Sequence, residues 1–192
     1  MRTIKIIVVF LFITLLGASY AYPHIVRLVL IDRSDFRNIG ANVYLSASLP
    51  EDAEQQMLDL IASARQRIAT HYGEPIALPV IVVLGNSKEI EQYGLNGPPG
   101  KFLFAPWGNY LLLDFKQASI DVTAHELVHA EIVSRIGYIK RQFEIPTWFD
   151  EGAAMQVDFR EKYTSTDAID PDEFSRVIKL DKPNQFLSLI HI

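Results

Sequence analysis

The chain has no cysteine among its 192 residues. This absence excludes a disulfide framework, a thiol nucleophile and a lipid-modified N-terminal cysteine. Because no thiolate ligand is available, any metal ion that the protein binds has to use nitrogen and oxygen donors.

The sequence also lacks an excess of positive charge. Its formal net charge is −5, and removing Arg2 and Lys5 with the N-terminal leader leaves −7. Nucleic acid is therefore not expected as a partner, since proteins that bind it present a concentrated basic surface. One short basic cluster, Arg135, Lys140 and Arg141, reads as a solvated loop.

A long apolar run lies near the N-terminus, from Ile6 to Leu16. Two basic residues precede it, and small residues that fit a signal-peptidase site follow it before Tyr22. Residues 1–21 are therefore interpreted as a secretory signal or, alternatively, as a single-span membrane anchor. Both alternatives place the remaining domain, residues 22–192, outside the cytoplasm, either exported to a periplasmic or extracellular space or tethered to a membrane.

Strand patterns and helical patterns both occur along the rest of the sequence, which predicts a domain that contains strands and helices. The expected strands are residues 24–31, 41–46, 79–84, 101–105 and 110–115. The expected helices are a long one that starts at residues 49–52 and ends before Gly73, and a short one at 86–93, capped by Asn86 or Ser87. The last two strands form a hairpin. No repeat or low-complexity tract interrupts this order.

The segment H-E-L-V-H, residues 125–129, is the most informative motif. It lies in an apolar-periodic segment, residues 120–136, and a glycine follows as at a helix C-terminus. Residues four apart on a helix are separated by about 40° around its axis, so His125 and His129 present their rings to one ion. Glu126 points to a neighbouring face, where a carboxylate can take the proton of an attacking water.

A catalytic zinc ion needs a third protein ligand and one open position for water. Glu131 lies on the far side of the helix, and Glu144 precedes a proline in an expected loop. Glu151 begins a second apolar-rich stretch that reads as a helix able to pack beside the first. The sequence therefore predicts Glu151 as the third ligand, beside the two histidines.

H-E-L-V-H followed by P-T-W-F-D-E-G-A-A resembles the gluzincins, the thermolysin and aminopeptidase group of zinc metallopeptidases, and most of all the peptidase-MA-like domains. The resemblance implies a zincin-like α+β fold with a small mixed sheet and an active-site helix. It also implies that His125, His129 and Glu151 hold zinc and that Glu126 is the general base. Gluzincins pair an extended substrate with an edge strand upstream of the motif helix, here residues 101–105 or 110–115.

Aromatic residues are dense in the expected hairpin. Phe102, Phe104 and Trp107 suit either an apolar specificity pocket or the core, and residues of this kind more often belong to the core. They are therefore not assigned to the site.

Supporting groups are less specific in the sequence. Asp121 or Asp158 is placed to accept a hydrogen bond from a ligand histidine, although Asp121 is better explained as an acid at a helix N-terminus. Asp150 stands where related second motifs often carry asparagine. Tyr163 and His191 are the candidates for stabilising an oxyanion, and neither lies in a recognisable motif. The abrupt apolar end, L-S-L-I-H-I, is consistent with a truncated reading frame.

These observations lead to the expectation of a zinc metallopeptidase that hydrolyses peptides or proteins outside the cytoplasm. Endopeptidase action is favoured, because no upstream acidic motif resembles the amine-binding segment of aminopeptidases. The alternative is a non-catalytic, membrane-anchored binding or assembly factor that retains a zincin fold. A structural zinc site ranks last, since it needs a fourth protein donor. The oligomeric state is left open.

Overall fold

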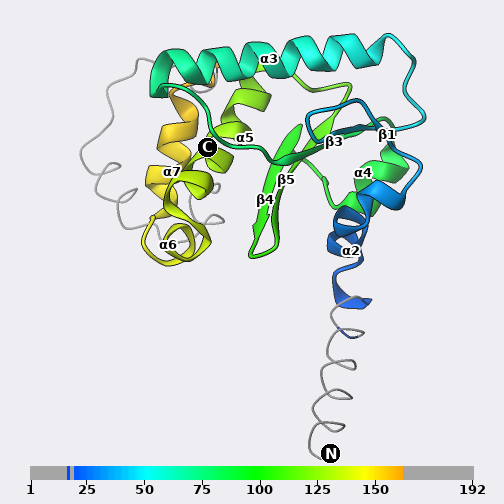
Figure 1. Cartoon of the computed structure of the whole chain (residues 1–192), viewed down its shortest axis with the longest axis horizontal. Coiled ribbons are helices and arrows are strands. Elements are labelled where there is room, and N and C mark those ends of the chain that lie inside the picture. The colour runs from blue at the N-terminus through cyan, green and yellow to red at the C-terminus, as the bar shows by residue number, and fades with distance from the viewer. Residues whose placement is uncertain (1–16, 18–19, 162–192) are drawn as a thin grey trace, which may run out of the picture.

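The computed structural model describes Gly17 and residues 20–161, and Figure 1 shows how their helices and strands are arranged. Most of the expected leader and both oxyanion candidates, Tyr163 and His191, lie outside the described residues. Among the described helices, none is long and apolar enough to cross a membrane.

A mixed sheet of five strands lies at the centre of the fold. In spatial order the strands are β1 Arg37–Asn38, β2 Val43–Leu45, β3 Val80–Leu84, β5 Gly108–Asp114 and β4 Gly100–Ala105. The β2–β3 and β3–β5 pairs are parallel, whereas β1 and β4 pair antiparallel with their neighbours. The small mixed sheet and its surrounding helices confirm the α+β class. Of the two hairpin strands, β4 is at the edge of this sheet and β5 is interior.

Two helices, α3 (Ala53–Tyr72) and α5 (Ile120–Ile136), cover one face of the sheet (Figure 1). The expected apolar stripe of α3 is confirmed, because Met57, Ile61 and Ile68 are buried in this core. They pack with alternate side chains of β3 and β5 and with the apolar side of α5. This core fixes the position of the motif helix against the sheet.

A second core lies on the other face of the sheet, under α2 (Pro23–Val29) and α4 (Ser87–Tyr93). Val82 and Leu84 of β3 point into it, since successive side chains of a strand point to opposite faces. The expected capping of α4 is confirmed: the Asn86 side chain accepts a hydrogen bond from the backbone N–H of Glu89 (3.1 Å).

The strand expected at residues 24–31 is wrong, because the chain forms α2 there and then a short 3-10 turn, Ile31–Arg33. Pro23 occupies the first turn of α2, where its fixed φ suits a helix and its missing N–H costs no hydrogen bond. The two buried residues, Leu28 and Ile31, are three positions apart, which is a helical spacing. The apolar, β-branched composition concealed this periodicity.

The loop expected around the basic cluster is also wrong. A short helix, α6 (Tyr138–Phe143), follows α5 directly, and α7 (Thr147–Met155) follows it. The helix expected from Glu151 is confirmed, but it begins four residues earlier, at Thr147. Arg141 of α6 is largely buried and pairs with Asp150 of α7, so it belongs to the interior of this region.

Candidate metal centre

His125 and His129 lie on the side of α5 that packs against α7. Ser119 caps α5 by accepting a hydrogen bond from the backbone N–H of Val122 (3.2 Å). The ring centroids of the two histidines are 5.1 Å apart, and both rings are buried. The helical spacing thus places two imidazoles side by side, as the sequence predicts.

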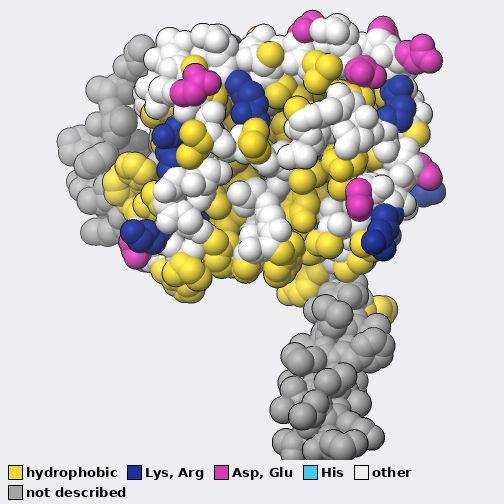
Figure 2. All heavy atoms as spheres, in the orientation of Figure 1, with side chains coloured by type: hydrophobic (Ala, Val, Ile, Leu, Met, Phe, Trp, Pro, Cys, Tyr) yellow, Lys and Arg dark blue, Asp and Glu magenta, His cyan; other side chains and the backbone are white. Residues whose placement is uncertain are grey.

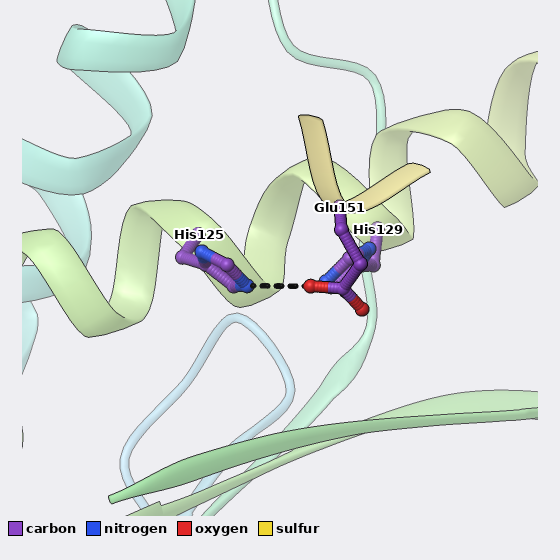
Figure 3. Close-up of side chains that lie close together, drawn as sticks. All are labelled: His125, His129 and Glu151. Carbon is purple, nitrogen blue, oxygen red and sulfur yellow. Dashed lines mark ion pairs between the residues drawn. The ribbon is translucent and has the colours of Figure 1, made fainter. Parts of the chain in front are cut away.

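Glu151 of α7 completes a three-residue cluster with these histidines (Figure 3). Its Oε2 is 3.5 Å from Nε2 of His125, and its Oε1 is 3.9 Å from Nε2 of His129. The three candidate donor atoms all lie within 4.8 Å of one another. In Figure 3 the carboxylate of Glu151 points from α7 toward the two rings on α5.

The geometry and the donor types fit a small metal ion. Metal–ligand bonds of about 2.0–2.2 Å in a tetrahedral site place neighbouring donor atoms about 3.4 Å apart. The two nitrogen–oxygen separations, 3.5 Å to Oε2 and 3.9 Å to Oε1 of Glu151, are close to that spacing. Two imidazoles and one carboxylate can therefore hold a metal ion here after small side-chain rotations.

Each histidine has a carboxylate at its other ring nitrogen. Nδ1 of His125 is 3.1 Å from Oδ2 of Asp158, and Nδ1 of His129 is 2.9 Å from Oδ2 of Asp150. A carboxylate that accepts from Nδ1–H fixes the ring orientation and leaves the lone pair of Nε2 free for a metal ion. Asp158 therefore lies where the sequence suggested, and Asp150, whose role the sequence left uncertain, holds the second histidine.

Two arginines hold these carboxylates in turn. Arg141 pairs with Asp150, and Arg160 binds both oxygens of Asp158. The acidic groups of the region are Glu126, Asp150, Glu151 and Asp158, and the basic ones are Arg141 and Arg160. Four carboxylates against two guanidinium groups leave a formal charge of −2 when the histidines are neutral, which a divalent cation balances.

Burial and hydrogen bonding have opposite effects on the titration of the cluster. Burial by itself lowers the pKa of His125, but its hydrogen bonds with Asp158 and Glu151 outweigh this and raise the pKa to about 9. The pKa of His129 is also raised: burial opposes this, and the Asp150 carboxylate is the main group that overcomes it. Burial raises the pKa of Glu151, whereas the hydrogen bond with His125 and the charges of both histidines bring it below its usual value. The pKa values of the two rings are therefore raised and that of the Glu151 carboxylate is lowered, because these groups attract one another.

Glu126 faces the edge strand of the sheet. Its Oε2 accepts a hydrogen bond from the backbone N–H of Phe102 in β4 (2.8 Å). Gly100 allows this approach, because a Cβ there would lie 2.7 Å from Cγ1 of Val122 and 3.1 Å from Cγ of Glu126 itself. The negative charge of Glu126 also raises the pKa values of both histidines, so this carboxylate is electrostatically coupled to the cluster.

Aromatic side chains of β4 line the region between the edge strand and the cluster. The ring of Phe102 stacks on His129, with centroids 6.3 Å apart, and on Phe104 at 6.0 Å. Phe104 also contacts Tyr138 and the guanidinium group of Arg141. Phe102 and Phe104 are thus half-buried beside the cluster, whereas Trp107 is exposed.

The other acidic residues that the sequence considered have different roles. Asp121 pairs with Arg67 of α3 and accepts from the backbone N–H of Phe159 (3.1 Å). Glu131 is buried and accepts hydrogen bonds from the backbone N–H groups of Ile76 and Ala77. Glu131 therefore fixes the connection between α3 and β3, which agrees with its exclusion as a metal ligand.

Sequence reasoning missed Arg141, Arg160 and the backbone N–H of Phe102. No spacing rule in the sequence identifies these groups. Each of them meets its acidic partner because separate segments pack together or because the chain turns.

Comparisons with protein-family models, with curated proteins and with solved structures gave no match to this chain.

Proposed function

We propose that this protein is a zinc-dependent peptidase with a zincin-like fold, of the kind that its two motifs resemble. The observation that carries the proposal is the convergence of His125, His129 and Glu151 on one point, with their donor atoms within 4.8 Å. The placement of Glu126 between this cluster and an edge strand supports a catalytic reading. A structural zinc site is disfavoured, because the described cluster offers three protein ligands rather than four.

In the proposed mechanism, His125, His129 and Glu151 would hold zinc, which would supply Lewis-acid polarisation of the scissile carbonyl and lower the pKa of a water. Glu126 takes the proton of this water as it attacks the carbonyl carbon and then delivers it to the leaving amine. Asp150 and Asp158 hold the two rings in orientation through Nδ1. Arg141 and Arg160 keep these two carboxylates in place.

The substrate is proposed to lie along β4. The backbone N–H of Asp114 donates to the carbonyl of Pro99, so Pro99 and Asp114 form a hydrogen-bonded pair just before the β4–β5 register. Such pairs alternate in an antiparallel ladder, which directs the backbone groups of Gly100, Phe102 and Phe104 away from β5. The N–H of Phe102 reaches Glu126, as this alternation requires. An extended peptide added to this edge would pass beside the candidate base.

The proposal also includes the site of action. The apolar run from Ile6 to Leu16, with basic residues before it, supports export or membrane anchoring, so that the peptidase works on peptide or protein substrates outside the cytoplasm. Endopeptidase action is the preferred form of this activity.

The test is to measure zinc content and cleavage of a mixed peptide library for the wild type, for Glu126→Gln and for Glu144→Gln. The Glu126→Gln side chain keeps an oxygen that can accept from Phe102 but cannot take a proton at neutral pH. We expect stoichiometric zinc in all three proteins and a loss of cleavage of roughly 10²–10⁴-fold in Glu126→Gln alone. Glu144 is exposed and outside the cluster, so Glu144→Gln is the matched control.

Two other outcomes would contradict the proposed function. Zinc without cleavage in the wild type would favour the alternative, a non-catalytic binding or assembly factor. Folded protein that takes up no zinc would contradict the metal centre as well as the activity.

A further inference from the structure

An apolar rim lies along one edge of the molecule, on three elements that are far apart in the sequence. It consists of Tyr22, Val29 and Leu30 at α2, Trp107 between β4 and β5, and Ile139 and Phe143 on α6. In Figure 1 α2, the tip of the β4–β5 hairpin and α6 all lie along the lower side of the coloured part of the chain. Figure 2 shows hydrophobic side chains along that same edge.

The side chains of the rim are too exposed to be part of the described hydrophobic cores. Trp107 is 64 % exposed, Ile139 65 % and Phe143 78 %. Exposed apolar residues that occur singly need no explanation, whereas a row of them across several elements indicates an interaction surface. The rim includes tryptophan and tyrosine, which are enriched where proteins meet the interface of a lipid bilayer.

Charge distinguishes this edge from the opposite one. The rim segments, residues 22–30, 106–109 and 138–143, contain no aspartate or glutamate. Their exposed cations are Arg27 and Lys140, since Arg141 is largely buried and paired with Asp150. Acidic side chains instead gather along the upper edge in Figure 2, where α3 lies. The exposed acids of α3 and of the residues just before it include Glu51, Asp52 and Asp59. An anionic lipid surface attracts the first edge and repels the second.

The position of the rim agrees with the way in which the chain enters the fold. The described chain enters α2 from below in Figure 1, and Tyr22 is the residue just before this helix. The apolar run Ile6–Leu16 precedes this residue in the sequence by only a few positions. A chain held at a membrane by that run would bring the rim, rather than the acidic face of α3, to the lipid surface.

We propose that the apolar rim docks the domain on the surface of an anionic lipid bilayer, with Trp107, Ile139 and Phe143 in its interfacial layer. The partner is the lipid surface itself, and the inference does not depend on the peptidase activity. The contact is peripheral, made by short elements whose apolar side chains enter the headgroup region. Lys140 and Arg27 add attraction to anionic headgroups.

The absence of native cysteine makes a direct test possible. Single variants of the full chain, Trp107→Cys, Phe143→Cys and Leu78→Cys, are labelled with an environment-sensitive fluorophore and mixed with vesicles of phosphatidylcholine and phosphatidylglycerol. Leu78 is the matched control, because it is 72 % exposed and lies on the connection between α3 and β3, which runs through the upper half of Figure 1. Replacing exposed side chains leaves the core intact, and circular dichroism checks this.

In vesicle-bound protein we expect a blue shift and a several-fold slower quenching by iodide at positions 107 and 143, with no change at position 78. A label at Ile139→Cys is expected to lose its shift when Trp107→Glu and Phe143→Glu are added. Labels at 107 and 143 that stay accessible to iodide in vesicle-bound protein would overturn the proposal, and so would a failure to bind vesicles. If the emission of these labels shifts to the blue with rising protein concentration in the absence of vesicles, the rim would instead be a contact surface between two copies of the chain.

Discussion

At the scale of single residues, the site depends on charged groups that do not touch the metal position. His125 and His129 can be identified from the sequence because a four-residue spacing on a helix fixes which side chains share a face. Asp150 could not be assigned in this way, since its contact with Nδ1 of His129 depends on how α7 packs against α5. The roles of Arg141 and Arg160 could not be predicted either, because the sequence does not show which carboxylate each arginine pairs with.

Asp150→Asn tests whether this support matters. The change removes the negative charge that orients His129 and leaves the largely buried Arg141 without its anion. We expect the zinc affinity to fall by roughly 10–100-fold, the usual effect of removing a carboxylate behind a ligand histidine. Competition with a chelator of known affinity measures this.

Asp121→Asn is the control for that experiment. Asp121 also pairs with an arginine, Arg67, but it contacts neither histidine in the structure. Zinc affinity should therefore be unchanged in Asp121→Asn. Equal losses of affinity in both variants would show that the effect is general to buried ion pairs and would remove the assigned role of Asp150.

At the scale of elements, sequence patterns succeeded where periodicity and caps agreed. The long helix α3, the central strand β3 and the capped helix α4 lie where they were expected. The patterns failed at α2, where β-branched composition favoured a strand while packing against the sheet and α4 selected a helix. The patterns also failed at α6, where the basic residues indicated an exposed loop. The structure has a helix there, and Arg141 is largely buried because α6 packs against α7.

The close contact between β4 and α5 at Gly100 leads to a prediction about stability. A methyl group at this position would lie 2.7 Å from Cγ1 of Val122, a β-branched side chain with little freedom to move. Gly100→Ala should therefore push the edge strand away from the motif helix and lower the free energy of unfolding by about 1–3 kcal/mol. Urea denaturation of the two proteins under identical conditions measures the difference.

Gly152→Ala is expected to stabilise the protein, in contrast to Gly100→Ala. Gly152 lies inside α7, and among the described residues a Cβ there would meet nothing within 4 Å beyond the backbone of its own helix. Alanine should raise the free energy of unfolding by roughly 0.5–1 kcal/mol, because it restricts the unfolded chain more than glycine does. If Gly100→Ala proved as stable as Gly152→Ala, the close approach of β4 to α5 would be contradicted.

At the scale of the whole molecule, the metal position joins two helices that already pack against each other in one core. α5 belongs to the core beneath α3, whereas α7 contributes Ala154 to that core and receives a hydrogen bond from the Tyr72 hydroxyl to the carbonyl of Ala153 (2.7 Å). A metal ion held by residues of both helices would add a bond between them that closes the chain from 125 to 151. Such an ion binds the native state and has no equivalent site in the unfolded chain.

Zinc should therefore stabilise the entire domain. At a free concentration of about 100 times Kd, we expect the free energy of unfolding of the chelator-treated wild type to rise by about 2.7 kcal/mol. His129→Ala should lose this increment, because it removes one of three donors. His71→Ala should retain it, since His71 is exposed on α3 and its Nδ1 is 3.0 Å from the Arg67 carbonyl of its own helix. Thermal and urea unfolding with and without zinc measure these differences. An equal increment in the wild type and in His129→Ala would place the zinc elsewhere in the chain and would contradict the centre built from α5 and α7.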